Sequence, residues 1–189
     1  MGWLDRVLGR SVPPPPSLDA LFAVPGAALT LESALGLRPT GRGSVSFRAA
    51  EGGASTATVD EIQALLAIGT GPEVERSVDP FGYTWLLVSR DPSDLAGLVT
   101  DLHAVNATLQ DNGFGPSLLC SLVGLADGSG RRVGLVYLYK RSTFYPFAPT
   151  GEQQRDSAFE LQVRSALGAD LPVEPDLSRW FPVWGAPGL

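Results

Sequence analysis

The chain has 189 residues, of which 44% are hydrophobic and 18% charged, the composition of a globular protein with one domain. A single Cys excludes an intramolecular disulfide and a single His excludes multi-histidine metal sites, so we expect neither a metal nor another cofactor. The net charge of -6, with one Lys and no basic run, argues against nucleic acid as a partner.

Residues 1–16 form a unit of their own in the sequence. Their apolar side chains recur at helical spacing, which predicts a short amphipathic helix, and Pro13 to Pro16 then impose an extended spacer. No segment reaches the roughly 18 apolar residues that span a bilayer, so we expect a cytoplasmic protein, at most peripheral at the inner face of the membrane. The candidates for weak contact with the membrane surface are Trp3, Leu4, Val7 and Leu8.

Hydrophobic periodicity predicts mixed helices and strands over residues 17–171, followed by a tail at 172–189 that is rich in Pro and aromatic residues. In chain order the predicted elements are a helix at 27–35, a strand at 44–48, a helix at 59–68, a hairpin of 74–79 and 83–88, a helix at 95–109, a hairpin of 118–125 and 133–140, and a last helix that ends at residue 167.

Start and stop signals bound the helices. Gly36, Gly113 and Gly168 are typical helix stops, and Asp91 predicts the N-cap of the central helix. The capping box formed by Thr150 and Gln153 predicts the start of the last helix.

Two tight hairpins around a helix favour an antiparallel sheet packed by helices and disfavour a parallel nucleotide-binding fold. We therefore predict a single α+β domain with a sheet of about five strands. The strand at 83–88 is apolar on both faces, which places it inside the sheet.

No residue pattern predicts catalysis. His103 flanks the apolar stripe of the central helix, where Asn106 is within reach, and the ordinary outcome there is a hydrogen-bonded, half-buried imidazole. Cys120 lies within an apolar strand that lacks the electropositive setting of a reactive thiol.

An acidic row precedes and enters the last helix. Glu152, Asp156 and Glu160 recur every four residues, and Glu160 is also four residues before Arg164. This pattern predicts a solvated helix face with one surface ion pair, and not a cation site.

Half of the aromatic residues lie in two segments, at 137–147 and in the tail. One interpretation is that the tail folds back on the first segment as an auxiliary core; the other is an exposed protein-binding patch, because Trp, Tyr and Arg dominate binding hot spots. The candidates for partner binding are Tyr137, Tyr139, Lys140, Arg141, Tyr145, Phe147, Trp180 and Trp184.

Several stretches together resemble the PspA-associated PspAB family of actinobacteria. They include LVTDLHAVN at 98–106, LVYLYKR at 135–141, TFYPFAP at 143–149, the segments 1–5, 8–10 and 19–22, and the tail. The resemblance covers nearly the whole chain and implies a small accessory protein linked to PspA, a coiled-coil protein of the phage-shock membrane-stress response. The order of elements is also similar to that of secretion-chaperone-like domains of the YbjN type.

Our leading hypothesis is a non-enzymatic adaptor that binds a protein, PspA or an envelope-stress component. One alternative is a small-molecule-binding protein or enzyme with a pocket near His103, Tyr137, Tyr139 and Lys140. The other is a secretion-type chaperone, for which we expect a homodimer.

Overall fold

The computed structural model of the chain describes residues 16–48, 53–66 and 74–189. The helices are η1 (Leu18–Ala23), α2 (Val24–Leu35), α3 (Gly53–Leu66), α4 (Leu95–Leu109), η2 (Gln110–Phe114), η3 (Gly115–Ser117), η4 (Tyr139–Arg141), α5 (Ser157–Leu167) and η5 (Leu177–Arg179). The strands are β1 (Arg38–Phe47), β2 (Val74–Val78), β3 (Thr84–Ser89), β4 (Leu118–Ala126), β5 (Arg132–Leu138), β6 (Thr143–Phe147), β7 (Pro149–Gly151) and β8 (Gln154–Arg155).

Six strands form one antiparallel sheet in the order β2-β3-β1-β4-β5-β6, and β7 and β8 form a small second sheet. The α+β class is confirmed, as are both hairpins and the internal position of β3. The large sheet has six strands where about five were predicted, because residues 143–147, which were not predicted as a strand, form β6 and pair with β5. β1 also begins earlier than predicted, since its first residues Arg38 and Pro39 pair with β4 ahead of a bulge. A bulge interrupts the ladder without ending the strand.

Helix boundaries test the capping signals. Gly36 ends α2 in the left-handed conformation, as predicted. The predicted N-cap of α4 is wrong: Asp94 caps the helix by accepting from the Gly97 amide at 3.0 Å, while Asp91 closes a turn with Ser93. Asp is a favoured N-cap residue at both positions, but residues 91–93 form a turn, so the helix begins after Asp94.

The start of α5 is also corrected. Thr150 and Gln153 lie in the β7–β8 hairpin, and Asp156 caps the helix by accepting from the Phe159 amide at 2.9 Å. The acidic row therefore does not follow one helix face. Glu160 is buried and pairs with Arg155 instead of Arg164, so the predicted surface pair is wrong.

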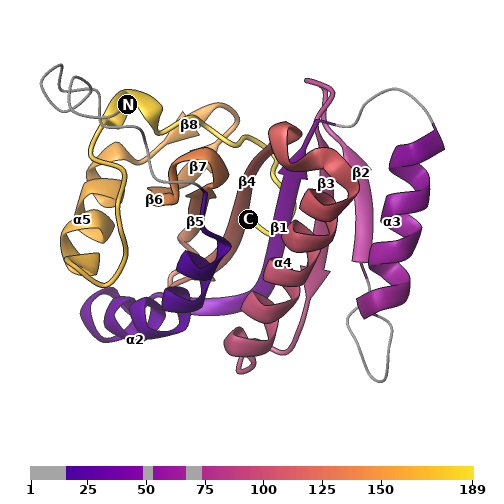
Figure 1. The fold of residues 1–189 in the computed structure, drawn as a ribbon. Coiled ribbons are helices and arrows are strands. Elements are labelled where there is room, and N and C mark those ends of the chain that lie inside the picture. Colours follow the sequence, from indigo (N-terminus) through magenta and orange to yellow (C-terminus); the bar gives the residue numbers. More distant parts are fainter. Residues whose placement is uncertain (1–15, 49–52, 67–73) are drawn as a thin grey trace, which may run out of the picture.

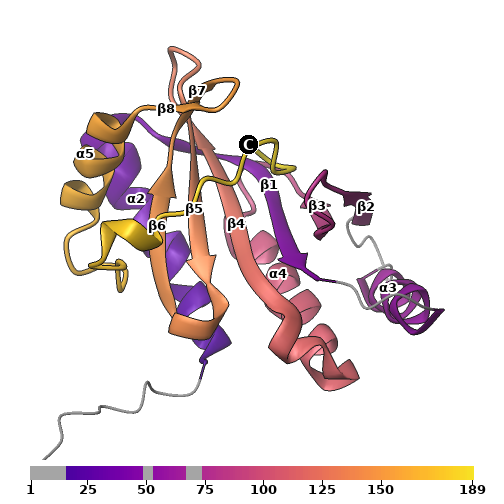
Figure 2. The ribbon, with the colours of Figure 1, turned by 90° about the horizontal axis from the view of Figure 1, so that it is seen from above.

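The two faces of the sheet have different covers (Figures 1 and 2). Helices α2, α4 and α5 cover one face, and the core between them includes Leu31, Val45, Leu102 and Val163. Figure 2 shows residues 172–189, called the tail below, crossing the sheet on the side away from α4. This order of layers buries both faces of the sheet.

The tail begins as an added parallel partner of β6, through a bridge between Phe144 and Val173. It then crosses the second face of the sheet, where Trp180 stacks on Tyr145 with ring centroids 6.1 Å apart, and Trp184 meets the Phe147 ring edge-on at 4.9 Å. Aromatic pairs at these separations add about 0.5–1.5 kcal/mol each to the area they bury. The tail thus completes a second hydrophobic core.

One helical stretch, Leu18–Leu35, is long and apolar enough by composition to cross a membrane. In the fold Leu21, Val24 and Leu31 of this stretch are buried against the sheet, whereas Phe22 and Leu29 are exposed. A core helix can pass the same test of length and composition, so this finding alone assigns no membrane span.

Candidate functional site

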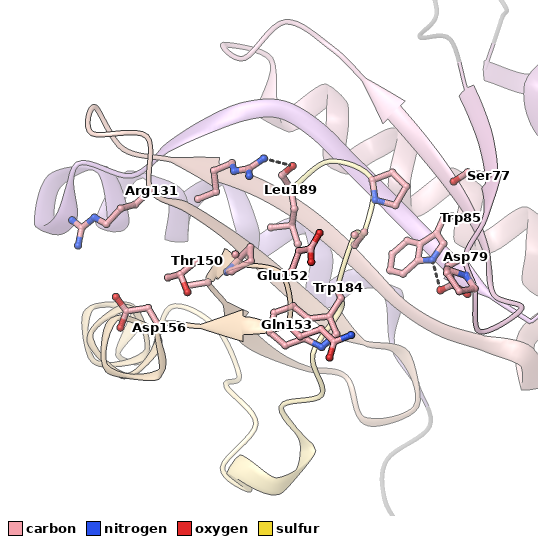
Figure 3. Close-up of a pocket in the computed structure, with 18 of the residues that line it drawn as sticks. Ser77, Asp79, Trp85, Arg131, Thr150, Glu152, Gln153, Asp156, Trp184 and Leu189 are labelled. Carbon is pink, nitrogen blue, oxygen red and sulfur yellow. Dashed lines mark hydrogen bonds between the residues drawn. The ribbon is translucent and has the colours of Figure 1, made fainter.

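Three turns and the end of the tail enclose a surface hollow of about 1150 Å³, called the end hollow below. Its walls are the β2–β3 turn, the β4–β5 turn, the β7–β8 hairpin and the tail from Trp184 to Leu189. In Figure 3 Glu152, Gln153 and Trp184 lie near its middle, with Asp79 and Trp85 on one side and Thr150 and Asp156 on the other. Segments far apart in the sequence therefore build one site.

The β2–β3 turn is held from within by Asp79. One carboxylate oxygen accepts from the Phe81 and Tyr83 amides at 2.9 Å, and the other accepts from the Trp85 indole at 3.0 Å. Burial alone would raise the pKa of Asp79, but the hydrogen bonds from Trp85 and the backbone outweigh it and lower the pKa. The turn is thereby fixed with Val78 and Phe81 pointing out, 60% and 65% exposed.

The β4–β5 turn is held in the same way, by hydrogen bonds to the carboxylate of Asp127. Its carboxylate accepts from the Ser129 hydroxyl and the Arg131 guanidinium, both at 2.7 Å, and from the amides of both residues, which lowers the pKa of Asp127. The Arg131 guanidinium lies 4.1 Å from the centre of the Phe159 ring. Arg131 is therefore already engaged by an anion and an aromatic face.

The third wall joins the β7–β8 hairpin to the tail. Glu152 and Gln153 are exposed at the hairpin tip. The Arg132 guanidinium donates to the Leu189 carbonyl at 2.9 Å, which fixes the far end of the tail against β5 (Figure 3). The site thus combines exposed apolar side chains of the β2–β3 turn with polar residues of the β7–β8 hairpin.

This chemistry suits binding. The titratable groups Asp79, Asp127 and Arg131 are committed to turn structure, and Asp156 caps α5. Within residues 16–48, 53–66 and 74–189, no three His, Cys, Asp or Glu side chains gather in a way that would hold a metal ion. Val78 and Phe81 expose apolar side chains at this site, and contiguous exposed apolar surface is typical of interaction sites.

The aromatic candidates from the sequence do not share one surface. Tyr137 lies on the helix-covered face and donates to the Ser17 carbonyl at 2.6 Å, whereas Tyr145 and Phe147 lie under the tail. Successive side chains of a strand point to opposite faces, so residues that are close in sequence are separated by the sheet. Tyr137, Tyr145, Phe147 and Trp180 are all buried, so in this conformation they do not offer their rings to a partner.

The remaining candidates lie at three places. Tyr139 is buried and donates to Gln110 at 3.0 Å, while Lys140 and Arg141 are exposed, and Arg141 pairs with Glu174 of the tail. Trp184 is partly exposed and lines the end hollow. The membrane-contact candidates Trp3, Leu4, Val7 and Leu8 fall outside the described residues.

The single His and the single Cys lie away from the end hollow. His103 contacts Phe22, with ring centroids 4.9 Å apart, and its Nε2 is 3.6 Å from the Asp19 carboxylate. Asn106 donates instead to Ser121 at 2.8 Å. Burial raises the pKa of the Cys120 thiol to about 12, so the thiol stays protonated and unreactive at neutral pH.

Sequence reasoning missed Val78, Phe81 and Arg132. The turn at 79–82 was predicted, but a turn signal says nothing of which neighbouring side chains it turns outward. A Phe inside a tight turn is the signal that was available, since Gly, Pro, Asn, Asp and Ser dominate such positions.

Fold and site define a single α+β domain whose sheet is covered by helices on one face and by its own tail on the other, with a hollow built from turns at the edge of that tail. The sequence model of the family PspAB, described as PspA associated protein B, matches residues 1–188, and the chain belongs to this family. No curated protein and no solved structure matches the chain.

Proposed function

We propose that this protein is an accessory protein of the PspA-linked stress response that acts in the cytoplasm by binding a protein, with PspA as the first partner to test. Membership of the PspA-associated family supports a role in the PspA system. The observation that carries the binding mechanism is the exposed pair Val78 and Phe81 at the rim of the end hollow.

The end hollow suits a protein surface better than a small molecule. At about 1150 Å³ it exceeds the usual 300–1,000 Å³ of small-molecule sites. An apolar rim that can be desolvated, next to hydrogen-bonded polar groups, is the usual anatomy of a protein interface. Phe81 is the expected anchor, because most of its ring is free.

The experiment is calorimetric titration of purified PspA into the wild-type chain and into the Phe81→Ala variant. Loss of an aromatic anchor typically costs about 2 kcal/mol, so we expect affinity to fall about 30-fold. Leu29→Ala is the matched control, because Leu29 is 70% exposed on α2, in the helix layer. Equal affinity of all three proteins for PspA would contradict the assignment of the end hollow.

The small-molecule candidates do not line either of the two hollows found in the described part of the chain. Neither the end hollow nor the smaller hollow of about 140 Å³ beside α5 is lined by His103, Tyr137, Tyr139 or Lys140. No observation favours this alternative over protein binding. The secretion-type chaperone and its homodimer stay a prediction, which light scattering of the concentrated protein tests.

Contact with the membrane surface through Trp3, Leu4, Val7 and Leu8 is a further part of the proposal. The short amphipathic helix that the sequence predicts for these residues would bind a bilayer only marginally by itself. We expect co-sedimentation with anionic liposomes that falls when residues 1–12 are deleted, and unchanged co-sedimentation would remove this part.

A further inference from the structure

The tail has a firmly held first part and a lightly held second part. In the first part Glu174 is fully buried and accepts from Arg141 and from the Thr143 hydroxyl at 2.9 Å. The Arg155 guanidinium donates to the Trp180 carbonyl and the Tyr145 hydroxyl donates to the Phe181 carbonyl, both at 2.7 Å. Charge-assisted and buried bonds of this kind fix the chain firmly up to residue 181.

The second part, residues 182–189, is called the cover below. Its internal hydrogen bonds are two turn contacts of 3.2 and 3.3 Å, from Ala186 to Val183 and from Leu189 to Ala186. Among the described residues, its one hydrogen bond to the sheet is the contact of Arg132 with the Leu189 carbonyl. The cover is held mainly by apolar packing.

The sheet beneath the cover is shaped for an extended chain. A side chain at Gly124 would place its Cβ 2.2 Å from the Gly188 carbonyl oxygen, so only glycine lets the two backbones approach. At Gly134 the same atom would lie 3.1 Å from the Leu189 side chain. Two glycines on neighbouring strands thus form a slot for backbone with small side chains.

Two buried hydroxyls on this face have no hydrogen-bond partner in the described residues. Ser44 and Ser46 are fully buried, and their Oγ atoms are unpartnered. The register places Ser44 opposite Leu87 and Leu122, on the face that the tail covers. A buried hydroxyl without a hydrogen-bond partner destabilises the fold with the cover in place. The cover therefore packs against this face but gives the Ser44 and Ser46 hydroxyls no hydrogen bond.

We infer that the cover is exchangeable and that the sheet face beneath it is the inner part of the partner site. The ligand is an extended peptide segment with an aromatic side chain that replaces Trp184 against Phe147, small residues over Gly124, and a polar group within reach of Ser44. The cover lines the end hollow, so its displacement joins the hollow to the slot. This inference rests on the proposed function, since it extends the same site.

The test uses a fluorescein-labelled peptide with the sequence of residues 181–189 and fluorescence anisotropy with the full chain. In the wild type the resident cover competes and binding is weak. Trp184→Ala and Val183→Ala weaken the cover and leave the slot intact, so each raises the open fraction and tightens peptide binding, by about tenfold if the open fraction rises tenfold. Phe181→Ala is the control in the tail, because that ring is 59% exposed, and it leaves peptide binding at the wild-type level.

A second pair of variants locates the bound peptide. Gly124→Ala added to Trp184→Ala blocks the slot and abolishes the gain, whereas Gly128→Ala, which has open space around it, leaves the gain unchanged. Thermal melts show that each variant is folded. The inference is overturned if neither cover variant binds the peptide more tightly, if the Gly124→Ala double variant binds it equally well, or if light scattering shows that the wild-type covers are exchanged between two copies of the chain. These readouts contain no PspA, so their failure is distinct from a failure of the Phe81→Ala experiment.

Discussion

Replacing Glu160 by Gln is the sharpest test of how the last helix is joined to the sheet. Its carboxylate is 2% exposed and accepts from the Ala148 amide at 2.9 Å and from the Arg155 guanidinium at 2.7 to 3.0 Å. The same guanidinium holds the Trp180 carbonyl. One buried ion pair therefore connects β8, α5, the tail and Ala148, the residue that follows β6.

Breaking a buried pair by removing one charge costs about 3–5 kcal/mol when both groups are buried. The Arg155 side chain keeps 22% exposure and regains some hydration, so we expect a loss of about 2–3 kcal/mol from the free energy of unfolding. For a chain of this size that lowers the melting temperature by roughly 5–10 °C. Urea titration monitored by circular dichroism measures the free energies of unfolding of the wild type and of Glu160→Gln.

Glu152→Gln is the matched control, because it removes the same charge from an exposed position eight residues earlier. Exposed substitutions usually change stability by less than about 0.5 kcal/mol. If Glu160→Gln were as harmless as Glu152→Gln, the buried pair with Arg155 would be refuted, and the solvated face that the sequence suggested would stand.

Three further predictions concern other parts of the fold. Cys120, whose pKa burial raises to about 12, reacts with Ellman's reagent at pH 8 only after denaturation, and fast labelling of the native protein would show an open sheet face. Burial alone would raise the pKa of Glu174, but the hydrogen bonds from Arg141 and Thr143 lower it below its unfolded value of 4.5. The charged Glu174 side chain therefore stabilises the fold fully above pH 4.5, and this stabilisation is lost as the pH falls through the lower folded pKa. Melting temperatures measured as a function of pH show this loss in the wild type and not in Glu174→Gln. Asp94→Ala removes the N-cap of α4 and costs about 1 kcal/mol in urea titration, and an unchanged stability would contradict the cap.

Hydrophobic periodicity and turn residues in the sequence predicted most of the helices and strands. The helix predicted at 95–109 has the bounds of α4, because its apolar side chains repeat along the interface with the sheet. Both hairpins follow from turn residues between strands of matching period. The first half of β1 was missed, since Pro39 and Gly41 are poor strand residues and their place depends on pairing with β4 and on the bulge there.

The site was less accessible to sequence reasoning because it is made of contacts between distant segments. Phe81, Arg132 and Trp184 are brought to one hollow by the order of strands in the sheet, which no local pattern encodes. The burial of Glu160 depends in the same way on Arg155 and on the tail. The concentration of aromatic residues was a genuine signal, but strand alternation divides it between two faces.

The position of the tail has a consequence for biosynthesis. The ribosome makes residues 172–189 after every strand of the sheet, so a nascent chain that has emerged as far as α5 carries Trp85, Leu122 and Phe147 on a sheet face that has no cover. Apolar surface of this kind drives aggregation of incomplete chains. A chain that ends before residue 172 would therefore leave these apolar side chains without the cover that the tail provides.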